Sequence, residues 1–275
     1  MSRQTMPLGE GEVRVYLADP DRITSRPDAA LVLSPDDRAH VSRFRFERDQ
    51  NLARASRALQ RYALSACAPV DASAWEFAAD DNGKPFIVAP TMSPALSFSV
   101  ANTSGLVACV VNRGCPVGID VERVRSDVPF GVVERCWSRE ERATFDGLAP
   151  DDQRRRFVEM WTAKEAYAKA RGLGLSIDLR HVEVLFNDVE PQLRLDPSLQ
   201  DDAAGWCLFV WAPTPSHAAA VCLRTGGDDP SGSYGRGWEV SRCHWSIQAD
   251  ALPKPVQLLQ TRKNLYDFSI REPRL

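Results

Sequence analysis

The sequence lacks the patterns that mark several classes of protein. It has no apolar run near the roughly 18 residues of a membrane-spanning helix, and residues 1–5 lack the basic-then-apolar pattern of a signal peptide. The net charge of −3 is not that of a general nucleic-acid binder, which carries a basic stripe. We therefore expect a cytoplasmic protein that binds neither membrane nor nucleic acid.

Cysteine and histidine form no metal-binding or disulfide pattern. The seven cysteines are scattered and include no C-x-x-C pair. This arrangement predicts buried thiols in a reducing compartment rather than a disulfide framework. The four histidines have no metal-ligand spacing, so the sequence does not predict a zinc site.

The residues that are present predict a mixed fold. The chain has 275 residues, 44% hydrophobic and 26% charged, which is the balance of a globular protein. Periodicity and turn signals predict helix and then strands twice along the chain. The predicted strands are 13–18, 96–100, 106–111, 117–122, 181–186, 206–211 and 217–223, and the long helices are 47–66 and 150–171. We expect an α+β fold of two similar subdomains, 1–115 and 116–225.

Helix boundaries are marked by capping signals. Ser34 precedes proline and two aspartates, and Ser138 is followed three residues later by Glu141, so both serines predict helix starts. Gly172 closes the second long helix as a C-cap.

The end of the chain has a different character. Residues 225–237 are rich in glycine, serine and aspartate, which is typical of a flexible linker. Residues 238–275 contain no convincing periodic element. We therefore expect residues 226–275 to be a flexible C-terminal extension.

Three carboxylates form a candidate metal site. Asp120 and Glu122 are two residues apart on a predicted strand, so both side chains point to one face. Glu165 lies on the second long helix, with Lys169 one turn further on. Oxygen ligands from a strand and a helix would suit Mg²⁺. The alternative is an acidic strand end beside an ordinary i,i+4 ion pair worth ~0.2–0.5 kcal/mol.

Arginines on the first long helix leave two readings open. Arg54, Arg57 and Arg61 fall at i, i+3 and i+7, which places them on one helix face. That face is either solvated or turned toward an anion.

Three ordered motifs resemble one enzyme family. The segment from Gly118 to Glu122 resembles the G-[IV]-D-[IV]-E signature of 4′-phosphopantetheinyl transferases. The segment from Trp161 to Lys169 is similar to that family's W-[ST]-x-K-E-[AS]-x-x-K helix. The turn Gly83-Lys84-Pro85 is similar to the G-K-P turn of the longer, surfactin-synthetase-activating members. The resemblance covers roughly residues 10–225.

The resemblance implies both a reaction and a fold. The fold would place the active site in the cleft between two similar subdomains of a monomer. The reaction would move 4′-phosphopantetheine from coenzyme A to a serine of an apo acyl or peptidyl carrier protein, releasing adenosine 3′,5′-bisphosphate. The cofactor would be Mg²⁺, with Mn²⁺ as a substitute.

The resemblance also implies roles for individual residues. Asp120, Glu122 and Glu165 match the metal-binding acids. Glu165 is then the candidate base, aided by Asp120. Lys164 and Lys169 would hold negative charge on the transferring group, and Lys169 matches a contact to the coenzyme A phosphates.

Further coenzyme A contacts are expected in the first half of the chain. Lys84, between Gly83 and Pro85, matches a lysine near the 3′-phosphoadenosine, and Arg43 lies in a segment with basic contacts. The remaining two candidates are Asn102 and Thr103, and Asn102 departs from the family pattern. The family has S-H-[ST] where this chain has Ala101-Asn102-Thr103. Asn102 carries no charge, so the phosphate contact would lose ~1 kcal/mol or more unless Arg48 or Arg54 replaces it.

The sequence also offers a docking face for the carrier and two other functions. The run 154–156 is three arginines, a candidate docking face for an acidic carrier protein, or else a solvated helix face. Two other functions remain open: a different Mg²⁺-dependent phosphoryl-transfer enzyme, and a non-catalytic module that binds coenzyme A or a carrier. The sequence does not indicate which carrier is served.

Overall fold

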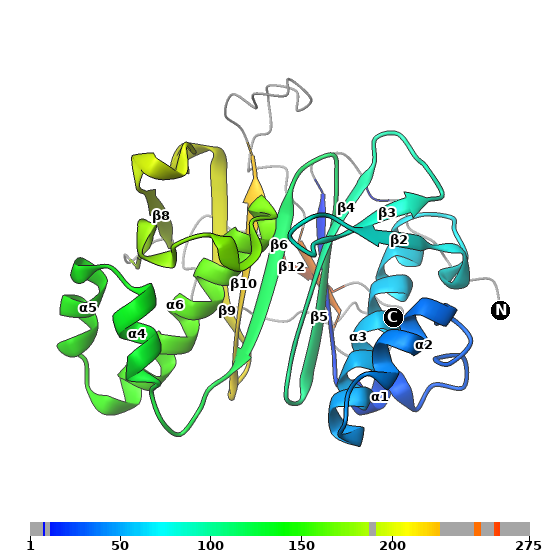
Figure 1. Ribbon diagram of the computed structural model, residues 1–275, viewed down its shortest axis with the longest axis horizontal. Helices are drawn as coiled ribbons and strands as arrows, with labels where there is room; N and C mark the ends of the chain where they lie inside the picture. The colour runs from blue at the N-terminus through cyan, green and yellow to red at the C-terminus, as the bar shows by residue number, and fades with distance from the viewer. Residues whose placement is uncertain (1–7, 9–11, 187–190, 226–244, 249–255, 259–275) are drawn as a thin grey trace. The chain divides into compact units, whose positions relative to one another are not determined.

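The computed structural model describes residues 8, 12–186, 191–225, 245–248 and 256–258 (Figure 1). The chain divides into two compact units, which are described one at a time. The first comprises Met1–Asp80, Pro85–Gly114 and Glu239–Leu275, and the second comprises Asp81–Lys84 and Cys115–Trp238. Helices and sheets occur in both, which confirms the predicted α+β class. The subdomain bounds 1–115, 116–225 and 226–275 stay a prediction.

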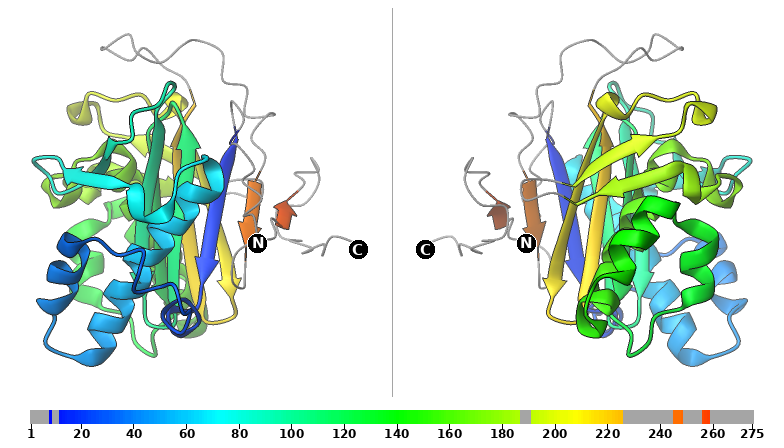
Figure 2. Two further views of the ribbon diagram at one scale, coloured as in Figure 1. Left: turned by 90° about the vertical axis from the view of Figure 1, so that its right-hand side faces the viewer. Right: turned by 90° about the vertical axis from the view of Figure 1, so that its left-hand side faces the viewer.

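A five-stranded sheet forms the first unit, with α3 packed along one face (Figures 1 and 2). The strand order is β12-β11-β1-β5-β4, and β1 pairs antiparallel with β5 and parallel with β11. The elements are β1 (Val13–Ala18), α1 (Pro20–Thr24), α2 (Pro35–Ser42), α3 (Glu47–Cys67), η1 (Ala72–Ala74), β2 (Glu76–Ala79), β3 (Pro85–Ala89), β4 (Leu96–Thr103), β5 (Leu106–Arg113), β11 (Trp245–Gln248) and β12 (Val256–Leu258). The core lies between α3 and this sheet, and includes Leu64, Phe98 and Val107.

Two details of this unit differ from the sequence expectations. β4 continues through Asn102 to Thr103, because the turn of the hairpin needs only Ser104 and Gly105, the latter at φ 86°. Strands β11 and β12 lie in the stretch expected to hold no regular element, since β11 pairs with β1 and β12 pairs in turn with β11. The linker predicted at 225–237 lies, apart from Thr225, outside the described residues.

The arginine face of α3 is largely structural. Arg61 is 2% exposed, and its guanidinium contacts the Asp37 carboxylate at 2.6 Å. Its Nη1 also donates to the carbonyls of Ala72 and Trp75 at 3.2 and 2.8 Å. Asp37 forms the capping box with Ser34, which confirms the predicted start of α2. Arg61 therefore joins α3 to α2, and its guanidinium is not available to a bound anion.

The second unit consists of a three-stranded sheet covered on one face by α6 (Figure 1). The strand order is β6-β10-β9, and both pairings are antiparallel. The elements are β6 (Val117–Arg123), α4 (Phe130–Cys136), α5 (Arg139–Asp146), α6 (Pro150–Arg171), η2 (Gly174–Ser176), η3 (Leu179–His181), β7 (Val182–Leu185), β8 (Gln192–Leu195), η4 (Pro197–Leu199), η5 (Ala203–Gly205), β9 (Trp206–Thr214) and β10 (His217–Arg224).

Helix α6 has the ends that the sequence predicts. Pro150 occupies the first turn, where its missing N–H removes no hydrogen bond. Gly172 ends the helix at φ 70°, in the left-handed region that favours glycine. Ser138 caps α5 in a capping box with Glu141, as predicted. Within the described residues, no helix is long and apolar enough to cross a membrane, and no disulfide joins the cysteines that lie there.

Candidate active site

Gly118 sets how closely α6 approaches the sheet. It lies on β6, and a Cβ built on it would lie far inside van der Waals contact of the Ala166 carbonyl oxygen and the Ala170 amide nitrogen. Only glycine therefore fits at this position. Because the backbones of β6 and α6 are in contact here, the next residues of β6 that face the helix lie beside the last turns of α6.

Asp120 is one of those residues, and it meets a lysine from the helix. Oδ1 of Asp120 accepts a hydrogen bond from Nζ of Lys169 at 2.7 Å. Asp120 is 6% exposed, and its Oδ2 has no hydrogen-bond partner. Its partner on β10 is Ala220, whose methyl group leaves room beside the carboxylate. Burial raises the pKa of the Asp120 carboxyl, and the Lys169 ammonium acts in the opposite direction.

Glu165 and Glu122 share this side of the unit. Glu122 pairs with Ala218 in the same register that opposes Asp120 to Ala220, so both acids face α6, as the alternation of β6 predicts. Burial raises the pKa of the Glu165 carboxyl, and the nearby charges of Asp120 and Glu122 raise it further. Lys169 pairs with Asp120, rather than forming the i,i+4 ion pair with Glu165 that was the alternative to a metal site.

The donor set fits a hard divalent cation in its chemistry. Carboxylate oxygens are the ligands such ions prefer, and the buried Oδ2 of Asp120 lacks any other partner. The mutual repulsion felt by Glu165 is the kind that a cation relieves. In the described part of the chain, no three His, Cys, Asp or Glu side chains are already gathered at metal-holding distance.

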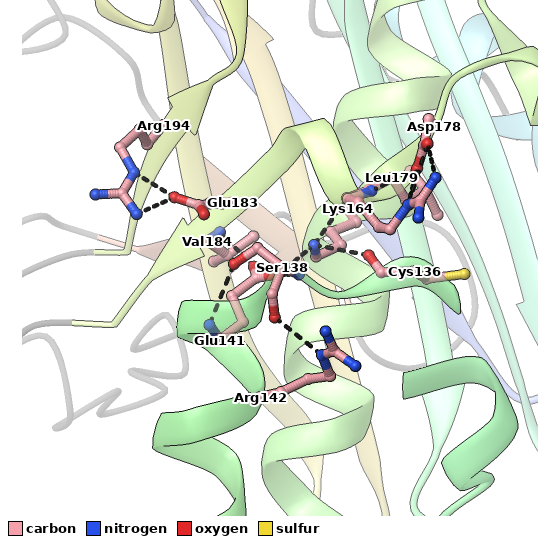
Figure 3. A network of polar contacts seen from close by, with 11 residues as sticks. Cys136, Ser138, Glu141, Arg142, Lys164, Asp178, Leu179, Glu183, Val184 and Arg194 are labelled. Carbon is pink, nitrogen blue, oxygen red and sulfur yellow. Dashed lines mark hydrogen bonds and ion pairs between the residues drawn. The ribbon is translucent and has the colours of Figure 1, made fainter. Parts of the chain in front are cut away.

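Lys164 is not available to a substrate, contrary to the sequence expectation. Its side chain is 0% exposed, and its Nζ contacts the Glu141 carboxylate at 2.7 Å (Figure 3). It also donates to the carbonyls of Cys136 and Leu179 at 3.0 and 2.9 Å. These three acceptors use all the hydrogen-bonding capacity of an ammonium group. Of the two lysines expected to hold the transferring group, only Lys169 lies beside the acids.

The Gly83-Lys84 turn packs on the end of α6, within the same unit. Nζ of Lys84 donates to the Ala170 carbonyl at 3.0 Å, and Nδ2 of Asn82 donates to the Gly172 carbonyl at 2.8 Å. Both acceptors belong to the last carbonyls of the helix, which have no intrahelical partner. Gly83 has φ 84°, as the tight turn requires. Asn82 is a contact that the sequence motifs missed, because nothing local in the sequence connects it to Gly172.

The other expected coenzyme A contacts lie in the first unit. Arg43 is the exposed C-cap residue of α2, and Pro85 begins β3. Nδ2 of Asn102 donates to Oγ of Ser56 at 3.3 Å, and Thr103 ends the same strand, β4.

The arginine run at the start of α6 is partly engaged. Arg154 forms an ion pair with Asp151, and Arg156 lies over the Phe186 ring at 4.0 Å from its centroid. Arg155 is exposed. The docking face predicted there therefore rests mainly on Arg155.

Comparison with known proteins identifies the family. The model of the 4′-phosphopantetheinyl transferase superfamily matches residues 116–222, and that of the N-terminal part of 4′-phosphopantetheinyl transferases matches residues 25–113. The 4′-phosphopantetheinyl transferase HetI of Nostoc sp. is 30% identical over 221 residues, covering 79% of this chain and 88% of the relative. The chain belongs to the 4′-phosphopantetheinyl transferase superfamily.

Other members of the superfamily agree with this assignment. The 4′-phosphopantetheinyl transferase Sfp of Bacillus subtilis is 26% identical over 190 residues, covering 69% of this chain and 81% of the relative. A solved holo-[acyl-carrier-protein] synthase of Thermotoga maritima is 27% identical and covers 40% of this chain and 62% of its own. Its TM-score is 0.33, so the family assignment rests on the sequence matches. The chain is thus a phosphopantetheinyl transferase of the surfactin-synthetase-activating type.

Proposed function

We propose that this transferase moves the 4′-phosphopantetheine group of coenzyme A onto a serine of an apo acyl or peptidyl carrier protein. The serine Oγ forms a bond to the β-phosphorus, and the bond from that phosphorus to the bridging oxygen breaks. Adenosine 3′,5′-bisphosphate leaves with the bridging oxygen. The observation that carries the proposal is the meeting of Asp120, Glu165 and Lys169 in a chain of this family.

Glu165 is the proposed base. Transfer to a serine needs a group that takes the hydroxyl proton, and a base acts best when its pKa approaches the working pH. Burial and two neighbouring acids move the pKa of Glu165 in that direction. Lys169 is 31% exposed at its side chain, so its ammonium can also face a phosphate oxygen.

Asp120, Glu122 and Glu165 are the proposed ligands of Mg²⁺, or of Mn²⁺ in its place. The ion would neutralise negative charge on the pyrophosphate of coenzyme A. Their oxygen-only donor set and the unpartnered Oδ2 of Asp120 support this choice. Asp120 also aids catalysis, because it holds the Lys169 ammonium 2.7 Å away.

Coenzyme A contacts are proposed at residues of both units. Lys169, Lys84 and Gly83 would supply those of the second unit, and Arg43 would supply a basic contact from the first. The remaining proposed contacts of the first unit are Pro85, Asn102 and Thr103. Asn102 would serve as a neutral donor. Its side-chain amide has two N–H donors, and one of them is directed to Oγ of Ser56.

The test is direct. Purified full-length chain is incubated with coenzyme A, Mg²⁺ and several apo-carriers, and the intact mass of each carrier is measured. We expect one added phosphopantetheine on at least one carrier and release of adenosine 3′,5′-bisphosphate. Gel filtration in the same buffer tests the proposed monomer, and fractionation of the native cells tests the proposed cytoplasmic location.

Two alternatives give other outcomes in the same assay. A non-catalytic module, suggested by the uncharged Asn102, would bind coenzyme A with no change in any carrier's mass. A different phosphoryl-transfer enzyme would consume coenzyme A with no carrier present. Either result would overturn the proposed function.

A further inference from the structure

Lys164, on the helix α6 that carries the candidate site, forms a buried ion pair with Glu141 of α5 (Figure 3). Lys164 is 0% exposed and Glu141 is 4% exposed. Taking two charges out of water is costly unless every polar atom finds a partner. The placement of such a pair beside Glu165 therefore calls for a physical reason.

Both carboxylate oxygens of Glu141 and all three donor positions of Lys164 are engaged. Oε2 of Glu141 accepts from the Ser138 amide at 2.8 Å as well as from Lys164, and Oε1 accepts from the Val184 amide at 2.8 Å. The three donor positions of Lys164 are taken by Glu141 and by two backbone carbonyls, those of Cys136 and Leu179. The pair thus joins α6 to the end of α4, the start of α5, η3 and β7 through directional bonds.

The face of α6 toward the sheet holds the helix close and is anchored near its C-terminal end. Ala166 and Ala170 lie on this face, and their backbone atoms meet Gly118 of β6. Tyr167, in the same buried cluster, donates from its hydroxyl to Oδ2 of Asp201 at 2.7 Å. The contact with the sheet therefore sets the distance of α6 and holds its last turns, and the Glu141–Lys164 pair holds the helix on another side.

Rotation matters because the reacting groups are on the next face. Glu165 follows Lys164 by one residue, which is about 100° around the helix. Lys169 is one turn beyond Glu165, on the same side. A small rotation of α6 would move both of these side chains away from Asp120.

We infer that Glu141 and Lys164 are positioning residues for the transfer reaction, holding α6 so that Glu165 and Lys169 stay aimed at Asp120. The inference rests on the proposed function. Neither residue touches the substrate: Lys164 is sealed from solvent by its three acceptors, and Glu141 lies behind it. The pair acts on the reaction only through Glu165 and Lys169, so its loss lowers kcat and, because Lys169 is also a proposed coenzyme A contact, raises the KM for coenzyme A.

The experiment compares Lys164→Met, Glu141→Leu and the double variant in the full-length chain. Each single variant leaves one buried charge without its partner, so its unfolding temperature falls by several degrees, about 5 °C or more. The double variant leaves no unpaired buried charge, but the four backbone groups that the pair satisfied lose their partner, so it regains only part of that loss. All kinetics are measured well below the lowest unfolding temperature.

Activity separates positioning from stability. In the double variant we expect kcat to stay about tenfold or more below wild type, with the KM for coenzyme A no higher than that of Lys169→Met. Hydrogen exchange of the α6 amides should also be faster. Leu64→Ala is the matched control, because it removes a buried side chain from α3 in the other unit and destabilises the chain without touching α6.

Other results would overturn the inference. Full recovery of kcat in the double variant would make the pair purely structural. A KM for coenzyme A that rises further in Lys164→Met than in Lys169→Met would make Lys164 a substrate contact. An equal loss of kcat in Leu64→Ala would trace the effect to instability. If the wild-type chain modifies no carrier, the proposed function fails instead. The unfolding temperatures and the hydrogen exchange of α6 still show whether the Glu141–Lys164 pair holds the helix in place.

Discussion

The Lys169 ammonium lies 2.7 Å from Oδ1 of Asp120, so the most deeply buried acid of the site is matched by a cation of the protein itself. A lysine at that distance competes with a metal ion for the same carboxylate. It also remains partly exposed, at 31%, on the side where a phosphate oxygen would approach.

Lys169→Met should therefore strengthen the binding of metal alone. The change removes a competing positive charge from Asp120, and an ion pair of this kind is worth up to ~1 kcal/mol, which corresponds to a factor of about five. Mn²⁺ binding to the full chain without coenzyme A, measured by calorimetry, checks this. Arg155→Met is the charge-matched control on the same helix, and we expect little change in it. Equal strengthening in both variants would contradict the pairing.

Asp120→Ala should have the opposite effect on metal. It removes the carboxylate whose Oδ2 has no other partner, so the Mg²⁺ concentration needed for half-maximal transfer should rise sharply. The measurement is a titration of transfer rate against Mg²⁺. An unchanged metal requirement would remove Asp120 from the proposed ligand set.

Glu165→Gln should abolish transfer and leave the fold intact, because glutamine keeps the shape of the side chain and cannot take a proton. Intact carrier mass measures the first effect and circular dichroism the second. Near-wild-type rates would exclude Glu165 as the base.

The same variant should show a pH-dependent gain in stability. Burial, with the charges of Asp120 and Glu122, raises the pKa of Glu165 in the folded state. Between the unfolded and folded pKa values the folded state then binds more protons, so wild-type stability falls as the pH rises through that window. Glutamine does not titrate. In metal-free buffer, urea unfolding should show the variant to be more stable than wild type at pH 8, with the difference shrinking toward pH 4. A variant that is less stable at pH 8 would contradict the sign.

Gly118→Ala should be strongly destabilising. The new methyl group would collide with the backbone of α6 at Ala166 and Ala170, and neither strand nor helix can yield locally. Overpacking of this kind costs about 1–3 kcal/mol and sometimes more. Gly131→Ala is the matched control, because a Cβ there meets nothing within 4 Å. Urea unfolding gives the free energy of unfolding of both variants. Their transfer rates are measured at urea concentrations below the unfolding midpoints.

The local features of this site could be predicted from the sequence, and the long-range ones could not. The alternation of β6 placed Asp120 and Glu122 on one face, and Pro150 and Gly172 marked the ends of α6. The pairing of Lys169 with Asp120 was not predicted, because the i,i+4 rule, which offered Glu165 as an alternative partner, describes an isolated helix and ignores a carboxylate brought in by a strand.

Burial of Lys164 was also hidden from the sequence. A lysine beside a glutamate in a family motif suggests chemistry, yet its three acceptors come from α4, α5 and η3. The one local signal was the capping box at Ser138, which fixes Glu141 at the start of α5. Pairing of β11 with β1 left no trace in periodicity, since backbone groups make that contact.

The hydrogen bonds from Asn82 and Lys84 to the end of α6 limit how the chain can be divided into fragments. The second unit is not one continuous stretch, because it includes Asp81–Lys84 from far upstream. A fragment that starts at residue 116 would leave the carbonyls of Ala170 and Gly172 without these two donors. Dissection by sequence boundaries would therefore yield a C-terminal piece whose central helix frays at the end nearest Lys169.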